Sequence, residues 1–311
     1  MDDEPGVVLA VDVGGTLTKL AWSRPDGRLV PEGVSRVPTQ RHGESVSVPW
    51  LAEVIGQQAA ARRDVGGFGV VAPGIVDAAA GLVRVAPNLG WRDVPLRDRL
   101  EDLSGLSGAV GHDVRTAGLA EWRLHQPAQT DLLFIALGTG IAGAPVVDGR
   151  LLEAGGYAGE IGHWSVAEAA GRRCACGRTA CLETISSAAG IVREYVHAGG
   201  SAASAEEVAD LARSGHQAAL DTFARAAAAL AEALGRYLTL LGPRLIVLGG
   251  GLSAAADLLI PPITAVIRAN ITFERQPQIV RAGLGADAGV IGAGMLGWDR
   301  VGRPEGVANA V

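Results

Sequence analysis

The chain has 311 residues, of which 48% are hydrophobic and 19% are charged, a balance that excludes a disordered protein. It carries 27 basic and 33 acidic side chains, so it lacks the basic excess that a nucleic-acid-binding face needs. No apolar run reaches the roughly 18 residues of a membrane span, and the acidic N-terminus has no signal-peptide pattern. We therefore expect a cytoplasmic α/β protein of two domains whose partners are small molecules, not nucleic acid or membranes.

One order of predicted elements occurs in both halves of the chain. The first half has β-rich runs and turns in the order 7–13, Gly14-Gly15-Thr16, 17–22, Asp26-Gly27 and 28–30. The second half repeats this order as 132–137, Gly138-Thr139-Gly140, 144–147, Asp148-Gly149 and 150–152. The repeat predicts a duplicated unit of three strands. Two hairpins that share turn chemistry by chance are the alternative.

The other predicted elements are helices and single strands. In chain order they are a helix over 49–63, a strand over 68–71, a helix over 216–241, a strand over 244–248 and a helix over 286–298. The longest helix has apolar residues at helical spacing over about seven turns, and Gly242-Pro243 ends it. We expect the last helix to return to the first domain and so to link both halves.

Three predicted strands run into glycine turns, where the backbone can approach a phosphate and present its N–H groups. The turns are Asp12-Val-Gly14-Gly15-Thr16, Gly138-Thr139-Gly140 and Gly249-Gly250-Gly251. None has the lysine of a Walker loop or the Rossmann spacing. A single glycine turn is usually only a turn, but three in one chain favour a nucleotide held between the domains. Asp12 is then a candidate ligand of magnesium-bound water, and the alternative is that it caps its own turn.

All three cysteines lie within eight residues, at Cys174, Cys176 and Cys181, and His163 precedes them. An odd, clustered set in a cytoplasmic chain indicates a metal site and not disulfides. Three thiolates and one imidazole would complete a tetrahedral zinc site of the structural type, with no position open for a reacting water. Three unrelated buried thiols are the alternative.

The sequence resembles the ROK family (repressor, open reading frame, kinase), which includes bacterial glucokinases. The resemblance rests on motifs that follow the family's order along almost the whole chain: Asp12-Val-Gly-Gly-Thr16, Ala72-Pro-Gly74-Ile-Val-Asp77, Pro87-Asn88-Leu-Gly-Trp91, Leu137-Gly-Thr-Gly-Ile-Ala-Gly143, Ala158-Gly-Glu160-Ile-Gly-His163, Gly171 to Glu183 and Leu248-Gly-Gly-Gly251. The spacing of the three cysteines followed by Leu182-Glu183 is the most specific of them.

The resemblance implies duplicated actin/hexokinase-like α/β domains of the RNase H-like type with an interdomain cleft. We expect a smaller domain from residues 1–121 plus 296–311, and a larger one, with the zinc loop, from 122–295. The resemblance further implies ATP and Mg²⁺ as cofactors, a structural Zn²⁺, a sugar substrate and a homo-oligomer, either a dimer or a tetramer. The predicted reaction is phosphoryl transfer from ATP to a hydroxyl of a hexose or hexose analogue, with the primary 6-hydroxyl as the expected acceptor.

The resemblance also assigns the site residues. Asp113 maps to the catalytic aspartate, which would accept the proton of the attacking hydroxyl. His163 would meet zinc with one ring nitrogen and a sugar hydroxyl with the other. The substrate-binding set implied in this way is Gly74, Asn88, His112, Asp113, Glu160, His163 and Glu183.

The chain departs from the family's pattern beside the predicted base. His112 and Arg115 stand where the family usually has asparagines. His112 lies where glucose is normally recognised, so an amino sugar or a C7-cyclitol is a candidate substrate. The competing hypotheses are a sugar-responsive transcriptional regulator and a sugar-binding protein without kinase activity. We expect neither, because the six residues before the first predicted strand leave no room for a helix-turn-helix domain and because Asp113 is intact.

Overall fold

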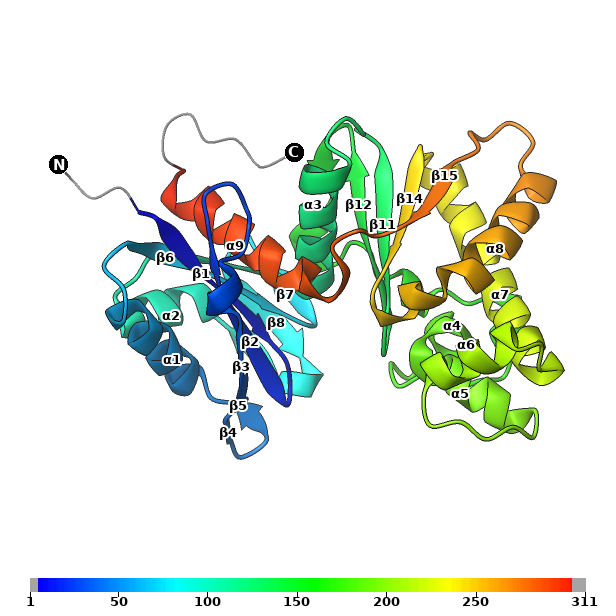
Figure 1. Cartoon of the computed structure of the whole chain (residues 1–311), viewed down its shortest axis with the longest axis horizontal. Coiled ribbons are helices and arrows are strands. Elements are labelled where there is room, and N and C mark those ends of the chain that lie inside the picture. Colours follow the sequence, from blue (N-terminus) through cyan, green and yellow to red (C-terminus); the bar gives the residue numbers. More distant parts are fainter. Residues whose placement is uncertain (1–4, 304–311) are drawn as a thin grey trace. The chain divides into compact units, whose positions relative to one another are not determined.

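The computed structural model describes residues 5–303, which form two compact units (Figure 1). Of the described residues, the first unit comprises 5–127, 153–158 and 287–303, and the second comprises 128–152 and 159–286. The predicted domain limits were 121/122 and 295/296. The position 295/296 falls inside one continuous helix, all of which belongs to the first unit. The predicted lack of a signal peptide at residues 1–4, and residues 304–311 of the predicted first domain, lie outside the described residues.

The first unit is built on a five-stranded sheet with the order β10-β6-β1-β2-β3. Its strands are β1 (Val7–Val13), β2 (Leu17–Ser23), β3 (Ser35–Pro38), β6 (Val65–Ala72) and β10 (Gly108–His112). Its helices are α1 (Val48–Ala60), α2 (Leu96–Ser104), α3 (Asp113–His125) and α9 (Ala288–Val301). The hairpin of β4 (Arg41–His42) and β5 (Ser45–Val46) and a small sheet of β7 (Ile75–Asp77), β8 (Leu82–Ala86) and β9 (Trp91–Val94) complete the unit.

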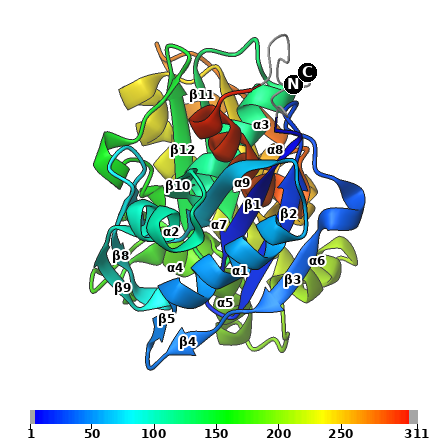
Figure 2. The ribbon, with the colours of Figure 1, turned by 90° about the vertical axis from the view of Figure 1, so that its left-hand side faces the viewer.

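Strand β1 is buried on both faces because helices cover both sides of this sheet (Figure 2). Leu9 and Val11 point into one core cluster, which also contains residues of α1 and α2. Ala10 points the other way, into a cluster with residues of α9. This alternation follows from the two-residue period of a strand, and it explains why β1 is a nearly continuous apolar run.

The second unit has a five-stranded sheet with the order β13-β12-β11-β14-β15. Its strands are β11 (Leu132–Leu137), β12 (Ile141–Val147), β13 (Arg150–Leu151), β14 (Leu245–Gly249) and β15 (Gln278–Arg281). Its helices are α4 (Glu183–Ser186), α5 (Ala188–His197), α6 (Ala205–Arg213), α7 (Gln217–Leu241) and α8 (Ala256–Asn270). The predicted helix 216–241 is confirmed, and it ends at Gly242 in a left-handed conformation, which glycine adopts without strain.

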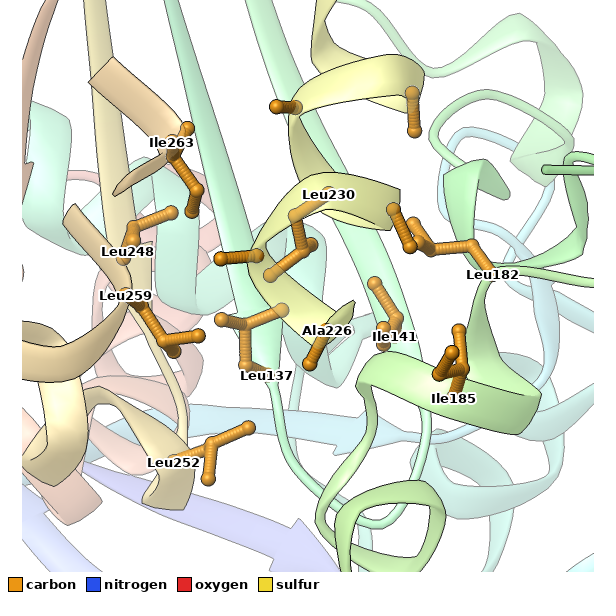
Figure 3. Packing of buried hydrophobic residues seen from close by; sticks show 14 of the residues in the cluster. Leu137, Ile141, Leu182, Ile185, Ala226, Leu230, Leu248, Leu252, Leu259 and Ile263 are labelled. Atoms are coloured by element: carbon orange, nitrogen blue, oxygen red, sulfur yellow. The ribbon is translucent and has the colours of Figure 1, made fainter. Parts of the chain in front are cut away.

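The core of the second unit lies between its sheet and α7 and α8. Figure 3 shows Leu137 and Leu248 of the sheet with Leu230 of α7 and Leu259 of α8 in this cluster. The stretch Gly251–Asn270 is long and apolar enough to cross a membrane by length and composition, which the sequence analysis did not anticipate. In the structure, however, one face of this stretch is buried in the core, at Leu259 and Ile263 among others.

The predicted duplication is confirmed by the strand pairing. Strands β1, β2 and β3 are antiparallel neighbours, and β6 and β10 continue the sheet in parallel beyond β1. Strands β11, β12 and β13 with β14 and β15 repeat every one of these relations. Both units therefore have one topology, as expected for duplicated actin/hexokinase-like α/β domains.

One strand prediction was wrong. Residues 28–30 contribute only an isolated bridge, at Leu29, and the third strand of the first sheet is β3. The reason is Pro31, which cannot donate a ladder hydrogen bond and instead begins a short 3-10 helix, Pro31–Gly33.

Candidate active site and metal centre

Three predicted site residues of the first unit lie at one edge of its sheet. Strands β1, β6 and β10 are parallel neighbours, so their carboxyl ends meet at the same edge. Asp12 lies at the end of β1, Gly74 lies two residues after the end of β6, and Asp113 directly follows β10. In open α/β sheets, ligands bind at this edge. The glycine at 74 is required because its φ is +106° and a Cβ there would lie 2.2 Å from the carbonyl oxygen of Val85.

The environment of Asp12 disfavours the ionised form of its carboxyl group. Burial and the nearby charge of Asp113 raise the pKa of Asp12 to about 6, although the positive charge of Lys19 opposes the rise. Lys19 is the cross-strand neighbour of Asp12 and forms an ion pair with Asp287. Two carboxylates that repel each other are the hard oxygen donors that Mg²⁺ prefers, so these residues fit the predicted metal. Sequence reasoning singled out Asp12 but missed the roles of Lys19 and Asp287.

Asp113 is the first residue of α3, and its side chain is about one-third exposed. Its Oδ1 accepts a hydrogen bond of 2.7 Å from the backbone N–H of Val114. This bond orients the carboxylate, while solvent and ligands can still reach it. A carboxylate so placed can accept a proton from a hydroxyl that approaches the edge of the sheet.

His112 is the N-cap of α3. Its Nδ1 accepts a hydrogen bond of 3.2 Å from the backbone N–H of Arg115, a contact that an asparagine oxygen makes equally well. Burial lowers the pKa of His112 to about 4, with the positive charge of Arg115 contributing, although the charge of Asp113 opposes this. The imidazole is therefore neutral at pH 7, and its proton resides on Nε2 because Nδ1 acts as an acceptor.

Arg115, the second departure from the family's motif, is almost completely buried, with 1% of its surface exposed. Its Nη1 donates to the carbonyl oxygens of Gly156 and Ala158 at 3.0 and 3.1 Å, and its Nη2 donates to Val76 at 3.0 Å. The guanidinium thus ties α3 to β7 and to the segment 153–158. Sequence analysis recorded the substitution without anticipating this bridging role.

Asn88 lies in a 3-10 helix, Pro87–Leu89, with its side chain exposed. The structure brings this loop next to the first glycine turn, because Arg41 donates to the carbonyl oxygens of both Gly15 and Asn88, at 3.3 and 3.2 Å. Thr39 fixes the same turn by donating its hydroxyl to the carbonyl of Gly14 at 2.9 Å. Arg41 and Thr39 were not among the predicted site residues.

In the second unit, the other two glycine turns meet. They follow the parallel neighbours β11 and β14, and a Cβ on Gly250 would lie 2.5 Å from the carbonyl oxygen of Leu137. A cavity of about 530 Å³ opens beside them, with Gly138, Thr139 and Gly251 in its wall. The remaining wall includes residues that the sequence analysis missed: Ser204, Glu206, Ala209 and Arg213. The predicted phosphate-binding turns therefore border a cavity large enough for a nucleoside.

The four predicted metal ligands converge. One ligand atom from each of His163, Cys174, Cys176 and Cys181 lies within 4.8 Å of all the others. The sulfurs of Cys176 and Cys181 are 3.7 Å apart, and Nδ1 of His163 is 3.8 Å from the sulfur of Cys174. Zinc–sulfur bonds of about 2.3 Å in a tetrahedron separate two sulfurs by about 3.8 Å. The donor set and its spacing thus fit a closed zinc site, in which His163 keeps Nε2 for another partner.

The two predicted sugar-binding glutamates lie in the second unit, within three residues of the metal ligands in sequence. Glu183 follows Cys181 by two residues, and its Oε2 accepts a hydrogen bond of 3.2 Å from the backbone N–H of Ile141. A Cβ on Gly140 would lie 2.6 Å from that oxygen, so the Glu183 carboxylate packs directly against the second glycine turn. Glu160 is half-buried and directly precedes the 3-10 helix Ile161–His163.

The chain is similar to proteins of known family. The model of the ROK family matches residues 8–299. A glucokinase from Halalkalibacterium halodurans is 34% identical over 313 residues, with 93% of this chain and 94% of that protein covered. An N-acetylmannosamine kinase from Escherichia coli is 29% identical over 299 residues, with 94% and 98% covered. The crystal structure of a ROK family glucokinase from Streptomyces griseus in complex with glucose and AMPPNP has a TM-score of 0.79 and 28% identity, with 94% of this chain and 100% of that chain covered. The chain belongs to the ROK family.

Proposed function

We propose that the protein is an ATP-dependent kinase that transfers the γ-phosphoryl group to a hydroxyl, the primary 6-hydroxyl, of a hexose or hexose analogue. The observation that carries the proposal is the pair of carboxylates at the edge of the first sheet, Asp113 and a half-buried Asp12 whose pKa is raised. Family relatives with the names glucokinase and N-acetylmannosamine kinase support it.

In this proposal Asp113 is the general base. The substrate hydroxyl donates its proton to the carboxylate while its oxygen attacks the γ-phosphorus, and the bond from that phosphorus to ADP breaks. Asp12 would hold Mg²⁺ through water, and the metal would supply positive charge for the phosphate oxygens. The glycine turns at 14–15, 138–140 and 249–251 would donate backbone N–H groups to phosphates, and the cavity beside Thr139 and Gly251 would take the nucleoside.

Glu160, Glu183 and His163 would recognise the sugar. Each carboxylate can accept from two vicinal hydroxyls, and charge strengthens those bonds. Zinc on Nδ1 of His163 would fix the ring plane and leave Nε2 to meet a hydroxyl. Zinc is structural in this proposal, since its four protein ligands leave no site for a reacting water. Asn88 and Gly74 of the first unit are further candidates for sugar binding.

His112 determines the finer choice of substrate in this proposal. Because Nδ1 caps α3, only the Nε2–H donor can face a ligand, at a greater distance from the backbone than the amide of the family's asparagine. A donor in this position suits an acceptor on a bulkier substrate, such as an acetamido carbonyl or a cyclitol oxygen. We therefore propose that an amino-hexose or a C7-cyclitol is preferred to glucose by at least about tenfold in kcat/KM.

The proposal includes a cytoplasmic location, because ATP and reduced thiols are found there, and a homo-oligomer, to be tested by light scattering.

The deciding experiment is a coupled ADP-release assay over hexoses, amino sugars and cyclitols. Asp113→Asn should lower kcat by roughly 10²–10⁴-fold and affect KM less. Asp102→Asn, at an exposed aspartate of α2, is the matched control and should retain activity. Near wild-type turnover in Asp113→Asn would exclude Asp113 as the base, and no ADP release on any substrate would exclude the kinase.

A further inference from the structure

A cavity of about 440 Å³ opens in the second unit where the loop before the cysteines meets α4 and α5. Its charged lining consists of Arg172 and Arg173 from the loop and of Arg193 and Glu194 from α5. Three arginines thus stand against one glutamate, although the whole chain has a net charge of −6. The excess of positive charge in this cavity favours an anionic ligand.

Glu194 does not neutralise Arg173 and Arg193, because its carboxylate oxygens already bind Arg172 and Arg225. The Nε of Arg172 donates to Oε1 of Glu194 at 2.6 Å, and Nη2 of Arg172 binds the other oxygen. Arg225 approaches Glu194 as well, with its Nη1 3.0 Å from Oε2. The Nη1 of Arg172 is also taken, by the carbonyl oxygen of Glu168 at 3.0 Å. The uncompensated charge is therefore that of Arg173 and Arg193.

These two arginines have donors to spare. Within residues 5–303, the side chain of Arg173 has no hydrogen bond or ion pair. Arg193 uses Nη2 for one bond, of 3.2 Å, to the carbonyl oxygen of Thr184. His197 lies at the same cavity and donates from Nδ1 to the carbonyl of Arg193 at 2.7 Å, a bond within the last turn of α5. Guanidinium groups match the oxygens of a phosphate in two-point contacts.

We propose that this cavity binds a phosphate group, either inorganic phosphate or that of a phosphate monoester, through Arg173 and Arg193. Binding has a consequence for the neighbouring site. Arg193 supports the carbonyl of Thr184, the residue after Glu183, so an anion that draws Arg193 toward itself changes the support of Glu183. Phosphate binding stands independently of the proposed function, whereas an effect on sugar affinity rests on it.

The test is calorimetric titration of the zinc-loaded chain with inorganic phosphate and with a hexose 6-phosphate, at constant ionic strength. A saturating non-hydrolysable ATP analogue with Mg²⁺ blocks phosphate binding at the glycine turns. We expect one saturable site, weakened at least about tenfold in the double variant Arg173→Gln, Arg193→Gln. Arg150→Gln, at an exposed arginine of β13 outside the cavity, should bind phosphate like the wild type.

The outcomes separate this inference from the proposed function. Binding that persists in an inactive Asp113→Asn variant supports the phosphate site whatever the reaction is. A lack of saturable binding by both probes, or equal binding in the double variant, overturns the site. If the double variant does not fold, Arg173→Gln alone decides, because that side chain is exposed and has no bonds to lose. In the active enzyme, we expect phosphate to raise the sugar KM in the wild type and not in the double variant.

Discussion

Replacing Asp12 by asparagine should make the ligand-free protein more stable at neutral pH, although we expect the same change to abolish turnover. Asp12 is half-buried, and its partial burial and the charge of Asp113 raise its pKa from 3.8 to about 6 despite the opposing charge of Lys19. A folded-state pKa above the unfolded value means that folding disfavours the ionised carboxylate. Asparagine keeps the shape of the side chain and removes that charge.

The size of the effect follows from the shift in pKa. A rise from 3.8 to about 6 corresponds to about 3 kcal/mol against the folded state when Asp12 is ionised. Below about pH 4 the group is protonated in both states, so the cost is absent. It grows as the pH rises from about 4 to 6 and is complete above that. The free energy of unfolding of Asp12→Asn should therefore exceed that of the wild type by about 1–3 kcal/mol at pH 8, and match it near pH 4.

Urea unfolding at a series of pH values measures this difference. Of the six tryptophans, all except Trp164 lie in the first unit, so tryptophan fluorescence reports mainly on the unit that contains Asp12. Asp102→Asn is the control, because it removes a carboxylate from an exposed position of α2. Mg²⁺ with an ATP analogue should stabilise the wild type and not Asp12→Asn. A variant less stable than the wild type at pH 8, or a stability difference that does not change with pH, would refute the electrostatic argument.

Three further predictions test other parts of the molecule. Elemental analysis should find one zinc per chain, lost together with stability and sugar affinity in Cys176→Ser, and full activity without metal would contradict the zinc site. His112→Asn should keep the cap of α3 and hence thermal stability, yet shift the ratio of kcat/KM values toward glucose, and an unchanged substrate ranking would argue against a role for His112 in selection. Arg115→Met should lower the free energy of unfolding by about 3 kcal/mol or more in urea unfolding, since it leaves three carbonyl oxygens without their hydrogen-bond donor. Wild-type stability would show that these bonds contribute little.

Local sequence patterns predicted much of the fold. The helical spacing of apolar residues fixed the extent of α7 to within one residue, because that spacing decides which face can be buried. The repeated strand and turn order predicted two sheets of one topology, and the strand pairing confirms it. The pattern failed at residues 28–30, where β-rich composition was outweighed by Pro31, and the third strand formed later as β3.

In the candidate site as well, the sequence revealed one group of residues, the metal ligands, and not another, the pair of carboxylates. The ligand set His163, Cys174, Cys176 and Cys181 could be proposed from sequence because residue type and spacing alone limit what such donors can bind. The carboxylate pair Asp12 and Asp113 could not be seen as a pair, since about a hundred residues separate them and only the parallel order β10-β6-β1 brings both to one edge.

Sequence by itself determined which backbone segments turn, which faces are apolar and which residues carry donor or acceptor groups. Tertiary structure alone decided how those groups are used. Nδ1 of His112 became a helix cap, Arg115 became a bridge between three carbonyls, and Arg193 came to support the residue beside Glu183. Periodicity and turn chemistry depend on residues a few positions apart, so the local sequence determines them. The partner of a polar group is whichever oppositely polarised group the rest of the chain brings within about 3 Å, and that depends on the whole fold.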